Sequence, residues 1–295
     1  MDQPIWTIRK ILEWTNGFFL RKEVDSPRLS AELLLCHVLK LPRIKLYTDF
    51  ERPLEEKDLT AFRDLVKRAG EQEPIAYLTC RAHFFDLELA IKPGVLIPRP
   101  DSETLVETGL TFLRHTTGME TPHVLDLCTG SGCIAAAMAK HHKTAIVTAV
   151  DIAPLAIEVA GENFKTLDLT SRITLLQGDL YAALAQATDP GPFHLILSNP
   201  PYIRSADMAK LDRSVRDFEP HLALDGGPDG LTIHRRILAD APARLLPGGR
   251  VMLEIAFDQA DAAKAMVSEF PRFGQPTILK DAAGNNRVLA ISLAS

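Results

Sequence analysis

Short apolar segments alternate with helical segments from about residue 122 onward, and no other feature constrains the fold as strongly. Helices are expected to begin near Gly132, near Ala153 and near residue 230, between segments rich in Val, Ile and Leu. These apolar segments are VLDL, AIVTAV, ITLLQ, HLILS and VMLEIA. Parallel strands covered on both faces are apolar throughout, so the alternation predicts an α/β domain built on a parallel sheet.

The 295 residues are expected to form two domains joined by a short connection. Residues 1–72 show helical patterns and no strand pattern, which predicts a small helical bundle. Residues 73–92 include AHFFDLELAIK, whose alternation predicts a β-hairpin within the linker. The α/β domain fills residues 93–295, and its segments 277–280 and 287–292 are expected to close the sheet as an antiparallel pair.

The composition is that of an ordinary globular protein, with 46% hydrophobic and 24% charged residues. A net charge of −5 argues against a generic nucleic-acid binder, because such proteins need basic surface. No apolar stretch approaches the roughly 20 residues that span a bilayer, and the start MDQPIW lacks a secretory signal pattern. The four cysteines form no C-x2-C pair, so we expect no metal site and a reduced, cytoplasmic protein.

The segment VLDLCTGSGCIAAAMA reads as a strand, a turn of small residues and a helix. Gly130 and Gly132 would let the backbone come close to a ligand at the helix N-terminus, and Thr129 adds a donor. Such a turn also occurs as a purely structural element, so the loop alone does not establish a site.

Two further strand ends carry acidic residues. Asp151 ends the next strand, 21 residues after Gly130, where a ribose diol would be bound; N-capping the following helix is its other reading. Asp179 and Leu180 follow the third strand, where a carboxylate could accept from an adenine amino group while leucine packs on the ring. Ligands of parallel sheets bind outside the carboxyl ends of the strands, and all these positions lie there.

Asp126, at the end of the first strand, distinguishes between nucleotide-type ligands. Ala135 is compatible with the third position of a dinucleotide-binding loop, so that pattern leaves NAD open. A carboxylate facing the loop, however, would repel a pyrophosphate and suit a ligand that bears a cationic amino acid.

The motifs DLCTGSG, VDIAP, GDL and NPPY, in this order and spacing, resemble S-adenosylmethionine-dependent methyltransferases of the seven-stranded, Rossmann-like class. EPIAYLT, VLIPRPDSETLVE, FEPHLAL, DGGPDGL and AGNNRVL, with the helical N-terminal segment, make nearly the whole chain similar to the PrmC/HemK family. The resemblance implies S-adenosylmethionine as cofactor, S-adenosylhomocysteine as product and no metal. It also implies a monomer whose helical bundle docks the protein substrate.

Members of that family methylate the glutamine of the Gly-Gly-Gln loop of peptide-chain release factors, so the resemblance implies release factors as partners. DLCTGSGCIA also occurs in a related family that acts on a glutamine of a large-ribosomal-subunit protein, which is a second substrate hypothesis. A DNA adenine-N6 methyltransferase, which shares NPPY, is a third. The acidic charge and the absence of an inserted target-recognition domain argue against it.

NPPY follows a strand, and the resemblance implies that it binds a planar NH2 group. The Asn199 side-chain oxygen and the Pro200 carbonyl would each accept one N–H, and Tyr202 would pack on the flat amide. Pro201 makes the preceding residue extended, which aims the Pro200 carbonyl outward. A strand-terminating turn with an Asn cap is the alternative.

The resemblance implies a set of cofactor-binding residues along the strand ends: Asp126, Leu127, Cys128, Thr129, Gly130, Gly132, Asp151, Ile152, Asp179, Leu180 and Asn199. Arg99 and Glu103 would help to close the site, unless they are solvated surface residues. Residues 219–221 and the loop 225–230 would either contact the substrate peptide or form plain surface. The family usually has glycine in place of Cys128, and we expect φ below zero there, with altered packing but retained binding.

Overall fold

The structure is a computed structural model that describes residues 5–116, 120–188 and 191–294. The chain divides into two compact units, described separately below. One unit contains Met1–Arg81 and Asp212–Phe218, and the other contains Ala82–Leu211 and Glu219–Ser295. Within the described residues, no helix is long and apolar enough to cross a membrane.

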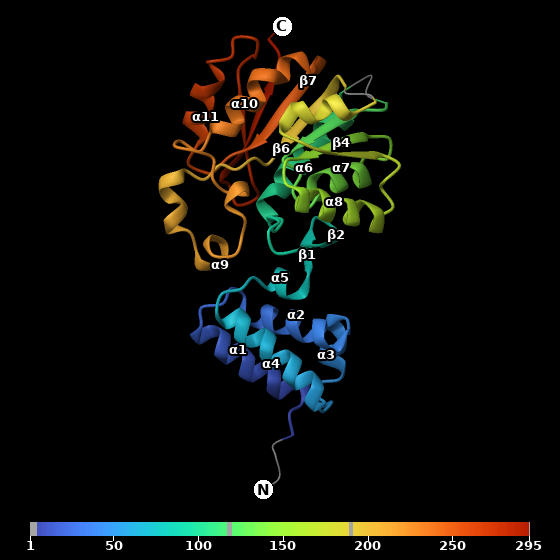
Figure 1. The fold of residues 1–295 in the computed structure, drawn as a ribbon, viewed down its shortest axis with the longest axis vertical. Coiled ribbons are helices and arrows are strands. Elements are labelled where there is room, and N and C mark those ends of the chain that lie inside the picture. Colours follow the sequence, from blue (N-terminus) through green and yellow to red (C-terminus); the bar gives the residue numbers. More distant parts are fainter. Residues whose placement is uncertain (1–4, 117–119, 189–190, 295) are drawn as a thin grey trace. The chain divides into compact units, whose positions relative to one another are not determined.

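The N-terminal unit is helical, as the sequence predicts (Figure 1). Its helices are α1 (Ile8–Arg21), α2 (Pro27–Leu39), α3 (Arg43–Thr48), α4 (Glu56–Gly70), α5 (Ile75–Thr79) and α9 (Arg213–Arg216). Phe19, Leu34 and Phe62, from three of them, are almost fully buried in one core. Because α1 to α5 each contribute apolar side chains to that core, burial holds these five helices together more than intrinsic propensity does.

One carboxylate lies inside this helical core. Glu32 is fully buried and accepts from Arg28 Nε and Arg43 Nε, each at 2.6 Å, and from the Tyr47 hydroxyl. Burial raises the pKa of Glu32, but these three donors outweigh burial and the net shift is downward. The arrangement satisfies a buried charge that would otherwise be costly, and it ties α2 to α3.

The second unit contains a seven-stranded sheet in the order β5-β4-β3-β6-β7-β9-β8. The strands are β3 (His123–Leu127), β4 (Ile146–Asp151), β5 (Ile173–Gln177), β6 (Phe193–Ser198), β7 (Leu245–Glu254), β8 (Thr277–Lys280) and β9 (Asn286–Ser292). The first five in the sheet order are parallel, and β9 is antiparallel to both of its neighbours. This confirms the predicted Rossmann-like sheet and its closing antiparallel pair.

Helices cover both faces of this sheet (Figure 1). One face packs against α6 (Glu103–His115), α7 (Cys133–His141) and α8 (Pro154–Thr166). The other packs against the 3-10 segment Leu180–Gln186, α10 (Thr232–Asp240) and α11 (Ala260–Val267). Adjacent strand residues Val124 and Leu125 belong to opposite cores, as the alternation of side chains along a strand requires.

The hairpin predicted near residue 82 is present as β1 (Arg81–Phe84) and β2 (Leu87–Ala90). Helices α3, α5, α6, α9 and α11 were not anticipated from the sequence. The prolines at positions 98 and 100 read as loop punctuation, yet Pro100 opens the 3-10 turn that leads into α6.

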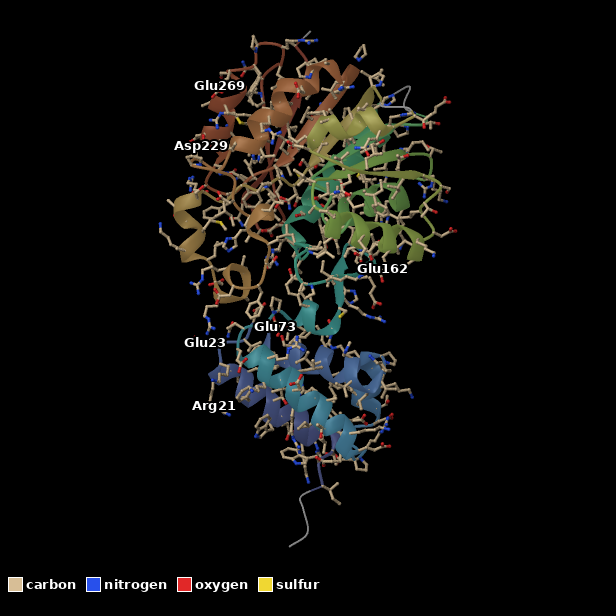
Figure 2. The ribbon with its side chains drawn as sticks, viewed as in Figure 1. Arg21, Glu23, Glu73, Glu162, Asp229 and Glu269 are labelled. Carbon is tan, nitrogen blue, oxygen red and sulfur yellow. The ribbon has the colours of Figure 1, made fainter. Side chains whose placement is uncertain are left out.

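Ion pairs on the surface connect elements that are distant in sequence. Figure 2 labels Asp229 and Glu269, which lie before α10 and after α11. Arg235, on α10, contacts Asp229 Oδ2 at 2.7 Å and Glu269 Oε2 at 3.4 Å. Asp229 also accepts from the backbone N–H of Leu231, which fixes the start of α10.

Candidate functional site

A cavity of about 880 Å³, including its open mouth, lies at the carboxyl ends of β3, β4, β5 and β6. Strand order reverses between β3 and β6, and this switch point is where ligands bind in open parallel sheets. The predicted site residues that line the cavity are Cys128, Gly130, Asp151, Ile152, Asp179, Leu180, Asn199 and Pro201. The structure therefore brings together residues from four separate strand ends.

The glycine loop approaches the cavity at Gly130. This residue has φ of +56°, and a Cβ added there would meet no atom within 4 Å, so the open space belongs to the cavity. Its N–H donates to Asp151 Oδ2 at 2.8 Å. Asp151 Oδ1 accepts from Ala153 N at 2.9 Å, so the carboxylate is fixed by two backbone donors from neighbouring loops.

The other predicted residues of the loop do not line the cavity, and they contact the interior of the domain instead. Gly132 has φ of +81°, and a Cβ there would lie 2.5 Å from the Phe164 ring, so its glycine is needed for packing against α8 and not for ligand approach. The Leu127 side chain is buried in the core, and its carbonyl accepts from the Ser198 hydroxyl at 2.7 Å. Thr129 donates its hydroxyl to Asp126 Oδ2 at 2.6 Å.

Asp126 is fully buried beneath this loop. Oδ2 accepts from Thr129 and from Ala135 N, whereas Oδ1 has no hydrogen-bond partner within the described part of the chain. Burial raises the pKa of Asp126 to about 7, and the two hydrogen bonds oppose that rise. Asp126 does not line the cavity, so its carboxyl supports the loop from the interior and is not shown to meet a ligand.

Cys128 corrects one of our expectations. Its φ is +58°, in the left-handed region that favours glycine, and not below zero as we expected. The side chain lines the cavity, and burial raises the pKa of its thiol to about 12, so the sulfur is a neutral wall atom. Leu180, on the opposite wall, also has a positive φ of +48°. Both residues hold an uncommon backbone conformation at the cavity.

Replacing Cys128 separates the effect of its backbone from that of its sulfur. Both Cys128→Gly and Cys128→Ala remove the thiol, but only glycine is unstrained at φ of +58°. We expect the glycine variant to exceed the alanine variant by about 1 kcal/mol in free energy of unfolding. Chemical denaturation measures this difference, and equal stability of the two variants would contradict the strained conformation.

The walls beyond Asp151 combine apolar and charged groups. Ile152 is 49% exposed, unusual for isoleucine, because it faces the open cavity. Asp179 pairs with Arg236 Nη2 at 2.7 Å, and Arg236 also lines the cavity. A flat ring would thus find Ile152 and Leu180 for packing and the Asp179–Arg236 pair for polar contact.

Two further loops line the cavity. Residues 94–96 come from the segment after the hairpin, and Pro220, Leu222 and Ala223 come from a second loop. Only Pro220 belongs to the segment 219–221, for which substrate contact was one of two hypotheses. Arg99 donates to Glu219 Oε1, and Glu219 Oε2 accepts from Ile97 N at 3.2 Å. Glu219 is only 5% exposed, so this charge-assisted bond joins the loops firmly.

Glu103 has a different role from the predicted site closure. Its Oε1 accepts from the backbone N–H of Phe85 at 2.8 Å, which anchors the hairpin turn to the start of α6. The residue does not line the cavity.

NPPY leaves β6 at the cavity wall. Asn199 lines the cavity, and its Nδ2 donates to the Ser102 hydroxyl oxygen at 2.9 Å. Within the described residues, no hydrogen bond uses Asn199 Oδ1 or the Pro200 carbonyl. Tyr202 does not line the cavity; its hydroxyl donates to Glu254 Oε1 at 3.2 Å. Asn199 Oδ1 is therefore left as an acceptor at the cavity, whereas Pro200 is buried and does not line it.

The loop DGGPDGL packs closely against the backbone of NPPY and the residue after it. A Cβ on Gly226 would lie 2.6 Å from the Pro201 carbonyl oxygen, and one on Gly230 would lie 2.3 Å from the Tyr202 carbonyl oxygen. Gln259 Nε2 donates to the same Tyr202 oxygen at 2.9 Å. Ile203 N donates to Leu224 O at 2.9 Å, and Gly226 N donates to Ile203 O at 2.8 Å. These contacts fix the backbone of the motif.

Sequence reasoning missed several residues of the site: Gly94, Val95, Leu96, Ser102, Arg236 and Glu254. Ser102 lies inside the segment VLIPRPDSETLVE, whose resemblance to the PrmC/HemK family could have pointed to it. Arg236 lies within a helix and had none. Across the described ranges, no group of three or more His, Cys, Asp or Glu side chains could hold a metal ion.

Comparisons with known proteins match both units. The family model of the PrmC N-terminal domain matches residues 10–79, and that of the methyltransferase small domain matches residues 102–227. The catalytic domain of hMettl16, solved with the MAT2A 3'UTR hairpin 6, is 16% identical with a TM-score of 0.52, covering 70% of this chain and 76% of that one. Sheet, cavity and family models define an S-adenosylmethionine-dependent methyltransferase.

Full-length relatives specify the family. A release factor glutamine methyltransferase of Rhodopirellula baltica is 40% identical over 294 residues, covering 99% of this chain and 98% of the relative. One of Geobacter sulfurreducens is 42% identical over 264 residues, covering 90% of this chain and 89% of the relative. The chain belongs to the family of release factor glutamine methyltransferases.

Proposed function

We propose that this protein transfers the methyl group of S-adenosylmethionine to the side-chain amide nitrogen of the glutamine in the Gly-Gly-Gln motif of release factors. One observation carries the proposal. Asn199 lines the cavity with its NH2 group turned to Ser102, so Oδ1 is available as an acceptor for a substrate NH2. We propose the carbonyl of the adjacent Pro200, a residue that does not itself line the cavity, as the second acceptor. The substrate is that named for the relatives, which are release factor glutamine methyltransferases.

The cavity suits the cofactor in shape and charge. Asp151 offers two carboxylate oxygens at the ribose position, and Ile152 and Leu180 offer apolar faces for adenine. Gly130 leaves open space at the loop, where the amino acid end would lie. When bound, S-adenosylmethionine supplies a methyl group on a positively charged sulfur, which is already activated for transfer.

The protein's part in the reaction is to orient a weak nucleophile. An amide lone pair is delocalised into its carbonyl, so it must be aimed along the S–CH3 axis. Asn199 Oδ1 and Pro200 O would each accept one N–H of the glutamine. Both bonds strengthen as the nitrogen gains positive charge in the transition state. The N–CH3 bond forms as the S–CH3 bond breaks, and the nitrogen then loses one proton to water.

A labelling experiment tests the substrate. The protein is incubated with methyl-labelled S-adenosylmethionine and, separately, with a release factor, a large-subunit ribosomal protein and DNA. Mass spectrometry then locates the label. We expect one methyl group on the Gly-Gly-Gln glutamine of the release factor. Label only on ribosomal protein or adenine would replace this substrate with one of the other two.

We further propose that the N-terminal unit docks the protein substrate in the cytoplasm, where translation ends. Exposed apolar side chains on that unit support this proposal: Trp14 is 49% exposed, Leu20 61% and Ile44 66%. Replacing all three with serine should raise KM for the intact release factor about 10-fold and leave KM for a short Gly-Gly-Gln peptide unchanged. Equal changes for both substrates would refute docking by this surface.

A further inference from the structure

The amide of Asn199 has two possible orientations, and the reaction needs only one. With Oδ1 toward the substrate, the side chain accepts a substrate N–H. With Nδ2 toward the substrate, two donors would face each other. The side chain's heavy atoms occupy nearly the same positions in both orientations, so its hydrogen-bond partners decide which is adopted.

Ser102 is the partner that Asn199 has within the described residues. Its hydroxyl oxygen lies 2.9 Å from Asn199 Nδ2, although the residues are 97 positions apart. Ser102 is 1% exposed and ends the 3-10 turn before α6, so its position is fixed. A hydroxyl can both donate and accept, however, and by itself it would stabilise either orientation of the amide.

Glu254 removes that ambiguity. It is fully buried at the end of β7, where Oε1 accepts from Tyr202 and Oε2 has no partner of ordinary hydrogen-bond geometry among the described residues. Ser102 is one of the groups that lower the pKa of this carboxyl, which is consistent with its hydroxyl lying beside the carboxylate. In its ionised form the carboxylate only accepts, so this form attracts the Ser102 hydrogen and leaves the oxygen lone pairs to Asn199.

The groups around Glu254 shift the pKa of its carboxyl in opposite directions. Burial raises its pKa to about 7; Ser102, Arg287 and Tyr202 oppose the rise, and Asp101 adds to it. Arg287 is 7% exposed and pairs with Asp101 Oδ2 at 2.8 Å, so positive charge is held close to the carboxylate. The backbone carbonyl of Glu254 also bonds to His234 Nε2 at 2.8 Å, which fixes the strand end.

We propose that Ser102 and Glu254 are positioning residues that set the orientation of the Asn199 amide, with Glu254 directing the Ser102 hydroxyl and Ser102 directing Asn199. The inference rests on the proposed amide methylation and adds two residues to it. It also gives Tyr202 a place in the same network, since its hydroxyl shares the Glu254 carboxylate.

A double-mutant cycle tests the inference, with kcat measured on a Gly-Gly-Gln peptide and cofactor affinity by calorimetry. Ser102→Ala should lower kcat about 30-fold, with cofactor Kd and melting temperature unchanged. In an Asn199→Ala background the same substitution should have no further effect, because Ser102 acts through the amide. An equal 30-fold loss in that background would overturn the inference.

Glu254→Gln provides a second, independent readout. Glutamine matches the shape of glutamate but can donate to Ser102, which would turn the hydroxyl toward Asn199 Oδ1 and lower kcat about as much as Ser102→Ala does. Full activity of both variants, with Asn199→Ala inactive, would refute the inference and leave the proposed function standing. Full activity of Asn199→Ala would instead refute the proposed binding of the substrate NH2 by Asn199 Oδ1 and the Pro200 carbonyl, and this inference with it.

Discussion

Replacing Asn199 with alanine is expected to lower methyl transfer about 1000-fold, because one of the two acceptors that orient the substrate amide is lost. Asn199 lines the cavity, so cofactor binding should weaken only a few-fold. Single-turnover transfer to a Gly-Gly-Gln peptide measures the first effect and calorimetry with S-adenosylmethionine measures the second.

Asn286→Ala is the matched control for this prediction. Asn286 donates from Nδ2 to the Phe257 carbonyl at 3.1 Å in an exposed hydrogen bond. Its replacement removes the same side-chain amide without changing the acceptors proposed for the substrate. Near wild-type transfer by Asn199→Ala would exclude Asn199 as a substrate acceptor.

Asp151→Ala is expected to weaken S-adenosylmethionine binding about 100-fold. The carboxylate would accept from both ribose hydroxyls, and each hydrogen bond to a charged group contributes about 1.5–3 kcal/mol. It also holds Gly130 N at 2.8 Å and Ala153 N at 2.9 Å, so its loss loosens two cavity loops. Calorimetric titration with S-adenosylmethionine measures the change, and a thermal melt verifies folding.

Asp151→Asn and Glu162→Gln give graded controls for this effect. Asparagine keeps one acceptor, so its affinity should fall between those of wild type and alanine. Glu162, on α8 and labelled in Figure 2, pairs with Lys92 at 3.0 Å away from the cavity lining, and its replacement should leave Kd unchanged. Wild-type affinity in Asp151→Ala would rule out the ribose role.

The sheet and much of the site were predictable because both depend on local sequence. Runs of apolar residues mark the buried strands in the sequence. A parallel sheet then brings the residues after each strand together at one edge. Asp151, Asp179 and Asn199 follow three different strands, so their meeting at one cavity follows from topology alone. The predicted closing pair of strands was found for the same reason.

Contacts between distant segments were not predictable. Ser102 and Asn199 are 97 positions apart, and Arg99 and Glu219 are 120 apart, so no spacing in the sequence relates them. Backbone conformation was equally hidden. Cysteine rarely adopts positive φ, so Cys128 gave no sign of φ of +58°, and only the Phe164 ring shows why Gly132 must be glycine.

The segment that follows NPPY, residues 205–218, is fixed at both ends by hydrogen bonds, and this affects how its length can change in evolution. Ile203 is paired with Leu224 and Gly226, and Glu219 is buried against Arg99, so the chain is fixed on both sides of residues 205–218. Lengthening a loop between fixed ends costs little free energy. Residues 206–211, which precede the part of this stretch that belongs to the N-terminal unit, are therefore where descendants could gain or lose residues while the backbone of NPPY keeps its shape.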